Sequence, residues 1–339
     1  MTKARDIASA TTPNANAALL ATFPHKNLII NGAMQVAQRG TSFTATGVFP
    51  VDRFKMDKNG ANITSTQNAL TSGDPYDEGF RFSAKMATTS TDSNSANYYL
   101  LRQRIEAQNL ASCGWNYTSS SSYITLSSWI KSSIAGTYYI VIRAKDGTEQ
   151  SYVHEYTLAA NTWKKISFSM QGNSNITFNM DNGEGLEITF SPYLGTDYTS
   201  SSTILNAWGA WNVNTGFGRD YTHDFGDTSG NTFEITGVQL EVGNTATPFE
   251  HRSYGDELAR CQRYYQKKDA QSAIFAPYAS NDGYGVYWST FPVVMRSSPT
   301  GSISLSGWFV GNTDTMGVNA YTASASNYTL PDYTMDAEL

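Results

Sequence analysis

The densest group of side chains with ligand-binding chemistry lies between residues 193 and 220. Aromatic rings can stack on the C–H faces of a sugar, while amide, carboxylate and guanidinium groups can hydrogen-bond its hydroxyls. The candidates are Tyr193, Tyr198, Trp208, Trp211, Asn212, Arg219 and Asp220. Together with the Ser and Gly residues around them, they resemble adaptable recognition loops. Two interpretations stay open: Trp208 and Trp211 contact a carbohydrate, or they cover the end of a hydrophobic core.

Two other aromatic clusters are further candidates for ligand contact. Trp115 lies in the segment Cys113–Tyr117, which we expect to be an exposed loop. The second cluster, near the C-terminus, consists of Tyr278, Tyr284, Tyr287 and Trp288. For both clusters, packing into a core is the alternative, because aromatic side chains also dominate the energetics of protein interiors.

Residues that could catalyse a reaction are poorly arranged. Hydrolysis of a glycan needs two carboxylates about 5–10 Å apart in a cleft. The carboxylates group instead in two turn-rich segments, as Asp74, Asp77 and Glu78 and as Asp220, Asp224 and Asp227, where we expect them to be solvated. The histidines lie outside any Gly-x-Ser-x-Gly turn, and no phosphate-binding glycine loop is present. The sequence therefore favours a protein that is not an enzyme.

One short segment could hold a metal ion. Asp181-Asn182-Gly183-Glu184 offers several oxygen ligands of the kind that Ca²⁺ prefers, but it lacks the spacing of an EF-hand loop. Asn182-Gly183 is also a common turn sequence. We therefore expect no cofactor, with Ca²⁺ as the weaker alternative.

The elements that position these residues are predicted to be strands. Apolar and polar residues alternate from Leu28 to Glu241, which is the period of a strand with one buried face. Asp146-Gly147 predicts a hairpin between two of the strands. Between strands, residues 192–231 form a long irregular segment, and such segments are often functional. The candidate strands are Asp52–Asp57, Phe80–Lys85, Tyr98–Ile105, Tyr123–Ile130, Thr137–Ala144, Tyr152–Leu158, Lys164–Met170, Leu186–Phe190 and Phe233–Glu241.

The pattern changes once, near residue 253. Ser253 and Asp256 fit a capping box, and the spacing that follows predicts a helix over 256–267. Strand patterns return at 283–291 and 302–310. We therefore predict an all-β protein: a jelly-roll β-sandwich with an extended N-terminal arm, one connecting α-helix and a small C-terminal β domain. The predicted boundaries are 1–26 for the arm, 27–252 for the lectin-like sandwich and 253–339 for the helix and small domain.

Composition excludes several function classes. Charged residues make up only 15% of the 339 residues, against about 25% in typical domains. The net charge is −6 and no basic block exists, so we expect no nucleic-acid partner. No apolar run reaches the length of a membrane span, so we expect no membrane insertion. The N-terminus lacks the apolar core of a signal peptide. Cys113 and Cys261 are predicted to be free thiols.

Two glycine-ended segments are predicted to open and close the sandwich as strands. They are Asn27–Gly32 and Ile235–Gly243, and we expect Arg53 to pair with Glu241 across them. Between and after them lie further short motifs in a fixed order: Gln38-Arg39-Gly40, Asp52-Arg53-Phe54, Leu126–Lys131, Thr162–Lys165, Thr247–Glu250 and Glu257–Tyr265.

This order of motifs, with the start Thr2–Ala8, resembles a family of bacteriophage virion proteins, especially tail-fibre and receptor-binding proteins with a carbohydrate-binding-module-like jelly-roll domain. The resemblance covers about residues 1–300. It implies a virion protein, a homotrimer that is not an enzyme, and adhesion to a polysaccharide of the host surface. The arm would attach to the phage tail, baseplate or capsid. These motifs fix no ligand residue.

Three alternatives to a host-binding fibre stay open. A head-decorating or head-fibre protein would share the fold and differ in where the arm docks. A structural tail or baseplate component would have no ligand site. A glycan depolymerase would need a carboxylate cleft.

Overall fold

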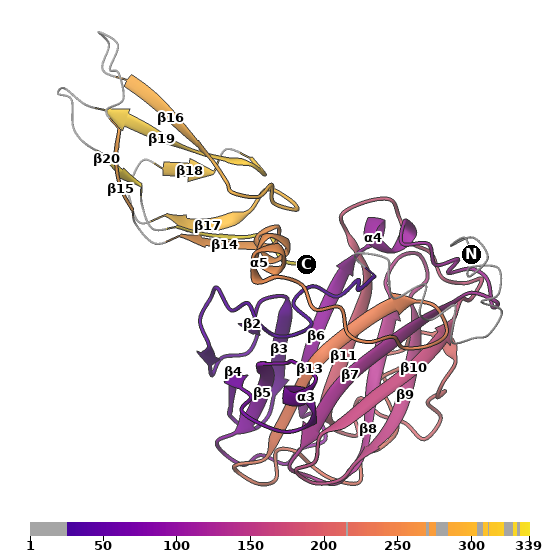
Figure 1. Cartoon of the computed structure of the whole chain (residues 1–339). Helices are drawn as coiled ribbons and strands as arrows, with labels where there is room; N and C mark the ends of the chain where they lie inside the picture. The colour runs from indigo at the N-terminus through magenta and orange to yellow at the C-terminus, as the bar shows by residue number, and fades with distance from the viewer. Residues whose placement is uncertain are drawn as a thin grey trace, which may run out of the picture.

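The computed structural model describes residues 26–214, 216–268, 271–275, 284–303, 308–310, 312–321, 328–330 and 333–339 (Figure 1). Two large antiparallel sheets pack face to face, and a group of smaller sheets extends beyond α5 (Tyr254–Gln262) (Figure 1). The predicted arm at 1–26 lies outside the described residues except for Lys26.

The first large sheet, sheet A, has the strand order β1-β4-β5-β13-β7-β10. Its central strand β13 is the closing segment of the sandwich, hydrogen-bonded to β5 and β7. The strands are β1 (Ser42–Phe43), β4 (Ile63–Ala69), β5 (Phe82–Thr88), β7 (Tyr123–Ser132), β10 (Lys164–Gln171) and β13 (Thr232–Val242).

The second large sheet, sheet B, has the order β12-β9-β8-β11-β6-β3-β2. The hairpin predicted at Asp146-Gly147 joins β8 and β9, where Ala144 pairs with Gln150. The strands are β2 (Val48–Val51), β3 (Phe54–Asn59), β6 (Tyr98–Glu106), β8 (Gly136–Ala144), β9 (Gln150–Leu158), β11 (Glu184–Leu194) and β12 (Trp208–Ala210).

The chain crosses repeatedly between the two sheets, which is the topology of a jelly-roll sandwich. The predicted fold class is therefore confirmed. Apart from the opening segment Asn27–Gly32, each predicted strand of the sandwich is present, with ends that differ by a few residues, because alternation locates a strand better than its ends. The sequence reading missed β1, β2, β4 and β12, and it missed two short helices, α3 (Asp74–Asp77) and α4 (Ala107–Ala111).

The main core lies between the sheets. On β8, Tyr138, Ile140 and Ile142 point into it, as the alternation predicts. The opposite face of the same strand is also covered, since Tyr139 is 2% exposed and Val141 is fully buried. Sheet B therefore has a second apolar layer on its outer face.

The irregular segment 192–231 supplies that second layer. Phe217 packs with Tyr139, Val141 and Val153 on the outer face. Gly218 lies so close to the sheet that an added Cβ would come within 2.7 Å of the Tyr139 ring. Apart from the end of β11 and from β12, the segment is irregular, and an isolated bridge between Leu205 and Val153 adds to its side-chain contacts with sheet B.

The opening segment runs beside the closing strand without forming a strand. Leu28 N donates to Leu240 O at 2.9 Å, and Val238 N donates to Gly32 O at 3.0 Å. The side chain of Asn27 spans the gap, since its Oδ1 accepts from Leu240 N at 3.0 Å. The prediction of a strand at Asn27–Gly32 is therefore wrong in hydrogen-bond pattern, because a side chain takes the place of one backbone partner.

The predicted pair Arg53–Glu241 is also wrong. Arg53 instead forms an ion pair with Glu338 and lies over the Tyr264 ring, with its guanidinium carbon 3.4 Å from the ring centroid. Glu241 accepts from the main-chain N–H of Thr247 at 2.8 Å. Glu338 is distant from Arg53 in the sequence, whereas Thr247 follows Glu241 within the same local segment.

The helix α5 begins at its predicted cap and ends early. Ser253 Oγ accepts from Asp256 N at 3.2 Å, which confirms the cap. The chain leaves the helix after Gln262 because Tyr265 already belongs to the next strand, β14, whose partner lies some 70 residues later. Arg263 and Tyr264 lie between α5 and β14, and both donate a hydrogen bond to Glu106 of β6.

The strands beyond α5 form three small sheets. The predicted strand at 283–291 is β16, while the one predicted at 302–310 is divided into β17 and β18. The sheets have the orders β14-β21-β17, β15-β20 and β16-β19-β18. Their strands are β14 (Tyr265–Lys268), β15 (Gln271–Phe275), β16 (Tyr284–Thr290), β17 (Thr300–Ile303), β18 (Trp308–Val310), β19 (Thr315–Tyr321), β20 (Tyr328–Leu330) and β21 (Tyr333–Asp336).

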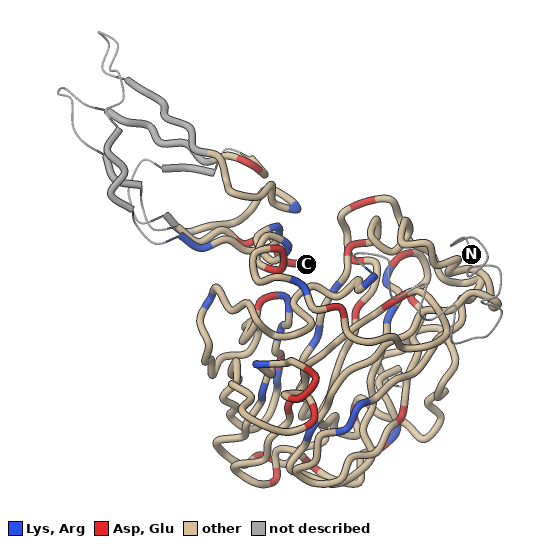
Figure 2. Tube along the Cα trace, in the orientation of Figure 1, with Lys and Arg blue, Asp and Glu red and all other residues tan. Residues whose placement is uncertain are grey.

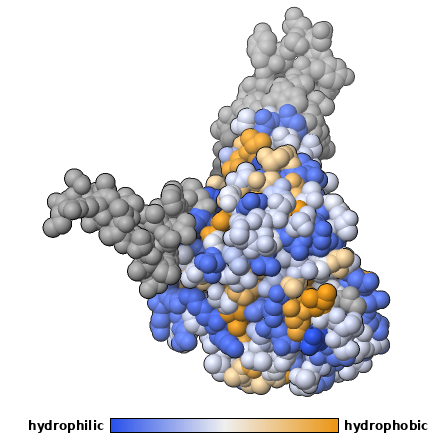
Figure 3. All heavy atoms as spheres, turned by 90° about the vertical axis from the view of Figure 1, so that its right-hand side faces the viewer, coloured by the Kyte–Doolittle hydropathy of each residue, from blue (hydrophilic) through white to orange (hydrophobic). Residues whose placement is uncertain are grey.

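The described surface is mostly polar on the side shown in Figure 3. Figure 2 shows acidic and basic residues close together around α5 and the C-terminus. On the side shown in Figure 3, apolar residues form separate small patches. No helix among the described residues is long and apolar enough to cross a membrane. Cys113 and Cys261 are both free thiols, as predicted.

The contact between the opening and closing segments gives a first prediction. An added Cβ at Gly32 would lie 2.1 Å from Val238 O, so Gly32→Ala must push the two segments apart. We expect it to lower the free energy of unfolding by about 2–3 kcal/mol in chemical denaturation. Gly255→Ala in α5 is the matched control, because an added Cβ there meets nothing within 4 Å. Equal stability of the two variants would contradict the prediction.

A second prediction concerns pH. His223 Nε2 lies 3.0 Å from Pro192 O, while its buried Nδ1 has no partner among the described residues. Burial lowers the pKa of His223 below the ordinary 6.5. Because the pKa is lower in the folded state, the unfolded state binds the proton more readily. The contribution of neutral His223 to the free energy of unfolding is therefore fully present above pH 6.5 and is lost as pH falls through the folded-state pKa. Chemical denaturation at a series of pH values should show the free energy of unfolding falling as pH falls below 6.5. His223→Gln should make this fall smaller. The part that remains is expected from His154, because burial also lowers the pKa of His154. An unchanged pH dependence in the variant would contradict this.

Candidate functional site

The outer face of sheet B brings together the side chains best suited to bind a ligand. Because side chains alternate along a strand, β6 directs Tyr98, Leu100, Arg102 and Arg104 to this face. Glu187 of β11 lies opposite Arg104, and Arg143 of β8 lies opposite Glu187. The register thus places an aromatic end and a charged end on one surface.

At the charged end, three arginines surround Glu187. Its carboxylate lies 2.9 Å from Arg104 Nε, 3.2 Å from Arg143 Nη1 and 3.4 Å from Arg102 Nη1, and its side chain is 1% exposed. Burial acts to raise the pKa of Glu187, but the three guanidinium groups outweigh burial and hold the pKa below its ordinary value. Glu187 is therefore a buried anion that orients the arginines.

A neighbouring carboxylate raises the question of hydrolysis. Glu184 Oε1 lies 3.2 Å from the same Arg104 Nε, and burial raises the pKa of Glu184. Two carboxylates with opposite pKa shifts are a pattern of glycoside hydrolases. Here Glu187 already accepts from Arg102, Arg104 and Arg143 and is closed to solvent, so the pair does not present two free carboxylates to a substrate.

At the aromatic end, a groove of about 210 Å³ opens on the surface. The rings of Tyr98 and Tyr198 meet edge to face, with centroids 5.6 Å apart. Val213 forms an exposed part of the wall, with 49% of its surface accessible. The lining residues are Tyr98, Leu100, Arg102, Leu194, Tyr198, Val213 and Phe217. The groove is thus mainly apolar, with one guanidinium group, that of Arg102, in its lining.

Hydrogen bonds inside the segment 192–231 fix the wall of this groove. Ser200 N and Thr203 Oγ1 both donate to Gly218 O, at 3.1 and 2.7 Å. Thr199 Oγ1 donates to Asp220 at 2.6 Å. Trp211 supports the wall from behind, with its ring edge-on to Phe217 at 4.7 Å and under the guanidinium group of Arg143 at 3.7 Å.

The residues predicted from the sequence fall into different places. Tyr198 lines the groove, and Trp211 supports its wall. Asn212, Arg219 and Asp220 are exposed beside it; Asn212 Oδ1 accepts from Asn214 N at 2.8 Å. Tyr193 packs inward against Tyr221, with centroids 5.6 Å apart.

Two predicted tryptophans lie away from the groove. Trp208, on the edge strand β12, packs against Tyr152, and its indole N–H donates to Gln171 O at 2.8 Å. Trp115 is only 3% exposed and belongs to the main core, so the expectation of an exposed ring there is wrong. It is buried because it packs with Tyr117 and Phe178, which the local sequence does not reveal.

Tyr287 and Trp288 lie on β16, but their side chains, like all of Tyr278, are outside the described residues.

The sequence reading missed Tyr98, Leu100, Arg102, Leu194, Val213 and Phe217 as groove residues. One signal was available. In the first half of β6 both alternating sets are apolar, with Tyr98 and Leu100 on one face and Tyr99 and Leu101 on the other, which indicates a stretch covered on both faces rather than one facing water.

A wider depression of about 400 Å³ lies between β9 and β10. The aromatic rings in its lining belong to His154 and Tyr156, and Tyr156 is only 6% exposed. Lys164 Nζ donates to Thr157 O at 2.9 Å there. The depression therefore offers less surface for stacking than the groove on sheet B.

The segment proposed for Ca²⁺ forms a turn. Asp181 Oδ1 accepts from Gly183 N at 2.9 Å, and Glu184 is turned toward Arg104. Within the described residues, no group of three or more His, Cys, Asp or Glu side chains is placed to hold a metal ion.

No family model and no curated protein matches the chain. Some solved structures are similar at low scores. A cyclase from Fischerella sp. TAU, in complex with 4-(1H-indol-3-yl)butan-2-one, has a TM-score of 0.35 and 10% identity, covering 64% of this chain and 96% of its own. A family 11 carbohydrate-binding module from Clostridium thermocellum, in complex with a β-1,3-1,4-mixed-linked tetrasaccharide, has a TM-score of 0.29 and 13% identity over 62% and 98%. A CBM4 structure has a TM-score of 0.30 and 12% identity over 63% and 98%. At these scores the similarity says nothing about ligand or activity.

Proposed function

We propose that the protein is a phage virion fibre or spike protein that binds a polysaccharide of the host surface through the outer face of sheet B. The observation that carries the binding role is the open groove of about 210 Å³, in which Tyr98 and Tyr198 present half-buried rings beside an arginine. An apolar pocket with a few fixed polar groups is the usual form of a small-molecule site.

The chemistry of the groove suits a sugar ring. The apolar wall made by Tyr198, Val213 and Phe217 would cover the C–H face of a pyranose. Arg102 would donate to its hydroxyls, because only two of its five N–H groups have partners among the described residues. Such a site needs no chemical step, and we propose that the protein is not an enzyme.

The virion role rests on the resemblance of the ordered sequence motifs to phage fibre proteins. In this proposal residues 1–26 attach the protein to the tail, baseplate or capsid, and the particle carries homotrimers. Individually weak glycan sites then gain strength because several copies engage one surface.

The groove gives a prediction for binding. Tyr198→Ala removes a ring from the wall and should weaken polysaccharide binding about tenfold, corresponding to ~1–2 kcal/mol for a buried aromatic contact. Trp208→Ala is the control, because Trp208 packs at the edge of the sheet on Tyr152. Affinity electrophoresis of both variants against host polysaccharide measures the effect. Loss of binding in Trp208→Ala alone would place the site elsewhere.

A separate prediction concerns the particle. Antibodies against the sandwich should label the tail of intact virions in immunogold microscopy, and native mass spectrometry should show three copies. Labelling of the head would favour the head-fibre alternative. Shortening of the host polysaccharide on incubation with the protein would favour a depolymerase.

A further inference from the structure

The aromatic groove continues into a second recess along β6. Tyr98, Leu100 and Arg102 line the groove, and Arg102 and Arg104 line the recess, so that Arg102 belongs to both. From residue 98 to residue 104 the strand extends about 20 Å at ~3.3 Å per residue. That length accommodates several linked sugar rings on one continuous surface.

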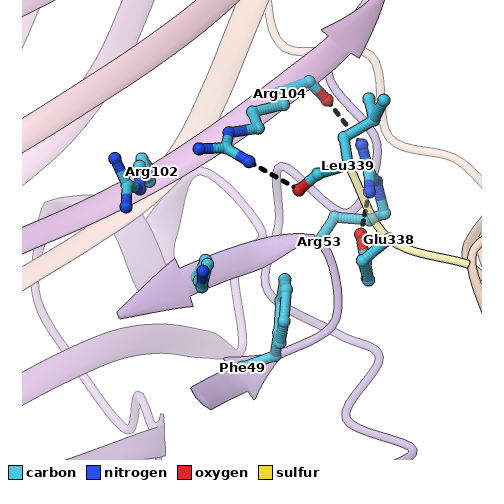
Figure 4. Close-up of a pocket in the computed structure, with 7 residues that line it drawn as sticks. Phe49, Arg53, Arg102, Arg104, Glu338 and Leu339 are labelled. Atoms are coloured by element: carbon cyan, nitrogen blue, oxygen red, sulfur yellow. Dashed lines mark hydrogen bonds and ion pairs between the residues drawn. The ribbon is translucent and has the colours of Figure 1, made fainter. Parts of the chain in front are cut away.

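The recess is small and cationic (Figure 4). Its volume of about 10 Å³ admits one water-sized group, such as an oxygen of an acidic substituent. Arg53, Lys55, Arg102 and Arg104 line it, together with Phe49, Leu339 and one acidic side chain, that of Glu338. Four of the lining side chains are cationic and one is acidic, whereas the whole chain has a net charge of −6.

The cations are held in position by carboxylates outside the lining and by the main chain of Leu339, which lines the recess. Arg102 pairs with Asp57 and Glu187, and Arg104 pairs with Glu184 and Glu187. Arg104 Nη1 also donates to Leu339 O at 2.7 Å (Figure 4). These contacts fix the guanidinium planes before any ligand arrives, which lowers the entropic cost of binding.

Donors remain unused in this arrangement. Arg102 Nε is buried and has no partner among the described residues. Lys55 Nζ, whose side chain is 29% exposed, has its nearest carboxylate oxygen, on Asp57, 3.6 Å away, beyond hydrogen-bond distance. Lys55 pairs in register with Arg102, so its ammonium group lies beside the shared arginine. An anionic oxygen would accept from the Lys55 ammonium group more strongly than a neutral hydroxyl would.

We propose that the recess takes an anionic group of the ligand, a carboxylate or a sulfate, while the groove stacks a neighbouring ring. The substrate class is therefore an acidic polysaccharide. This inference rests on the proposed glycan-binding function and adds the charge of the ligand to it. Charge-assisted hydrogen bonds to carboxylate or sulfate oxygens are about twice as strong as neutral ones.

The test compares three polysaccharides on the full chain by affinity electrophoresis: polygalacturonate, a sulfated galactan and neutral dextran. An acidic polysaccharide should bind about tenfold more tightly than the neutral one, and its binding should weaken as salt is raised. Lys55→Gln should remove most of that difference without changing the affinity for dextran. Comparison of polygalacturonate with the sulfated galactan tells a carboxylate from a sulfate.

Lys58→Gln is the matched control, because Lys58 lies on the same strand, lines neither cavity and donates to Ala61 O at 3.3 Å. Thermal denaturation of both variants checks that the fold is kept. Equal binding of acidic and neutral polysaccharides, unchanged in Lys55→Gln but weakened in Tyr198→Ala, would overturn the acidic ligand and leave the proposed function standing. Binding of none of the three would contradict both.

Discussion

Sheet B is covered on both faces, and much of the structure depends on that constraint. Its inner face packs against sheet A, while its outer face carries Tyr139, Val141 and Phe217 under the segment 192–231. A strand covered on both sides cannot alternate simply between apolar and polar residues. The outer layer leaves the rings of Tyr98 and Tyr198 half exposed, and the groove opens beside them.

The arginines around this sheet fall into two groups: one group surrounds a buried carboxylate, and the other connects the sandwich to the chain beyond it. Arg102, Arg104 and Arg143 surround the buried Glu187, and removal of that carboxylate would leave their charges crowded together.

Arg39, Arg53, Arg263 and Arg296 instead join the sandwich to the chain beyond it. Arg39 contacts Asp52, Asp336 and Glu338, and Arg296 donates to Asn182 O and Ala337 O. The chain beyond α5 is thereby tied to the sandwich by side chains at several points.

These contacts between the sandwich and the chain beyond α5 also explain the strained backbone of Arg53. Arg53 has φ of +73°, which is uncommon for a residue with a side chain. The tight turn between β2 and β3 requires this conformation, and the contacts of Arg53 with Glu338, Tyr264 and Arg104 O hold it. Such a conformation persists only when its surroundings over-determine it. The Asp52-Arg53-Phe54 motif is thus explained by the contacts of Arg53 with the chain beyond α5 rather than by pairing with Glu241.

Much of the fold followed from the sequence by itself. Alternation located strands such as β7, β8 and β9, Asp146-Gly147 located their hairpin, and Ser253 located the cap of α5. These signals are local: they come from side-chain period, turn chemistry and capping within a few residues. Tyr198 was also found among the groove residues, because a tyrosine in an irregular polar segment is a plausible contact for a ligand.

Only the tertiary structure decided which aromatic rings meet and which charges face a cavity. Trp115 and Trp208 look as accessible as Tyr198 in the sequence, yet distant residues bury the first in the core and pack the second at the sheet edge. The recess gathers Lys55, Arg102 and Glu338 from three parts of the chain. Strand register and long-range packing determine these neighbours, and neither leaves a mark in the local order of residues.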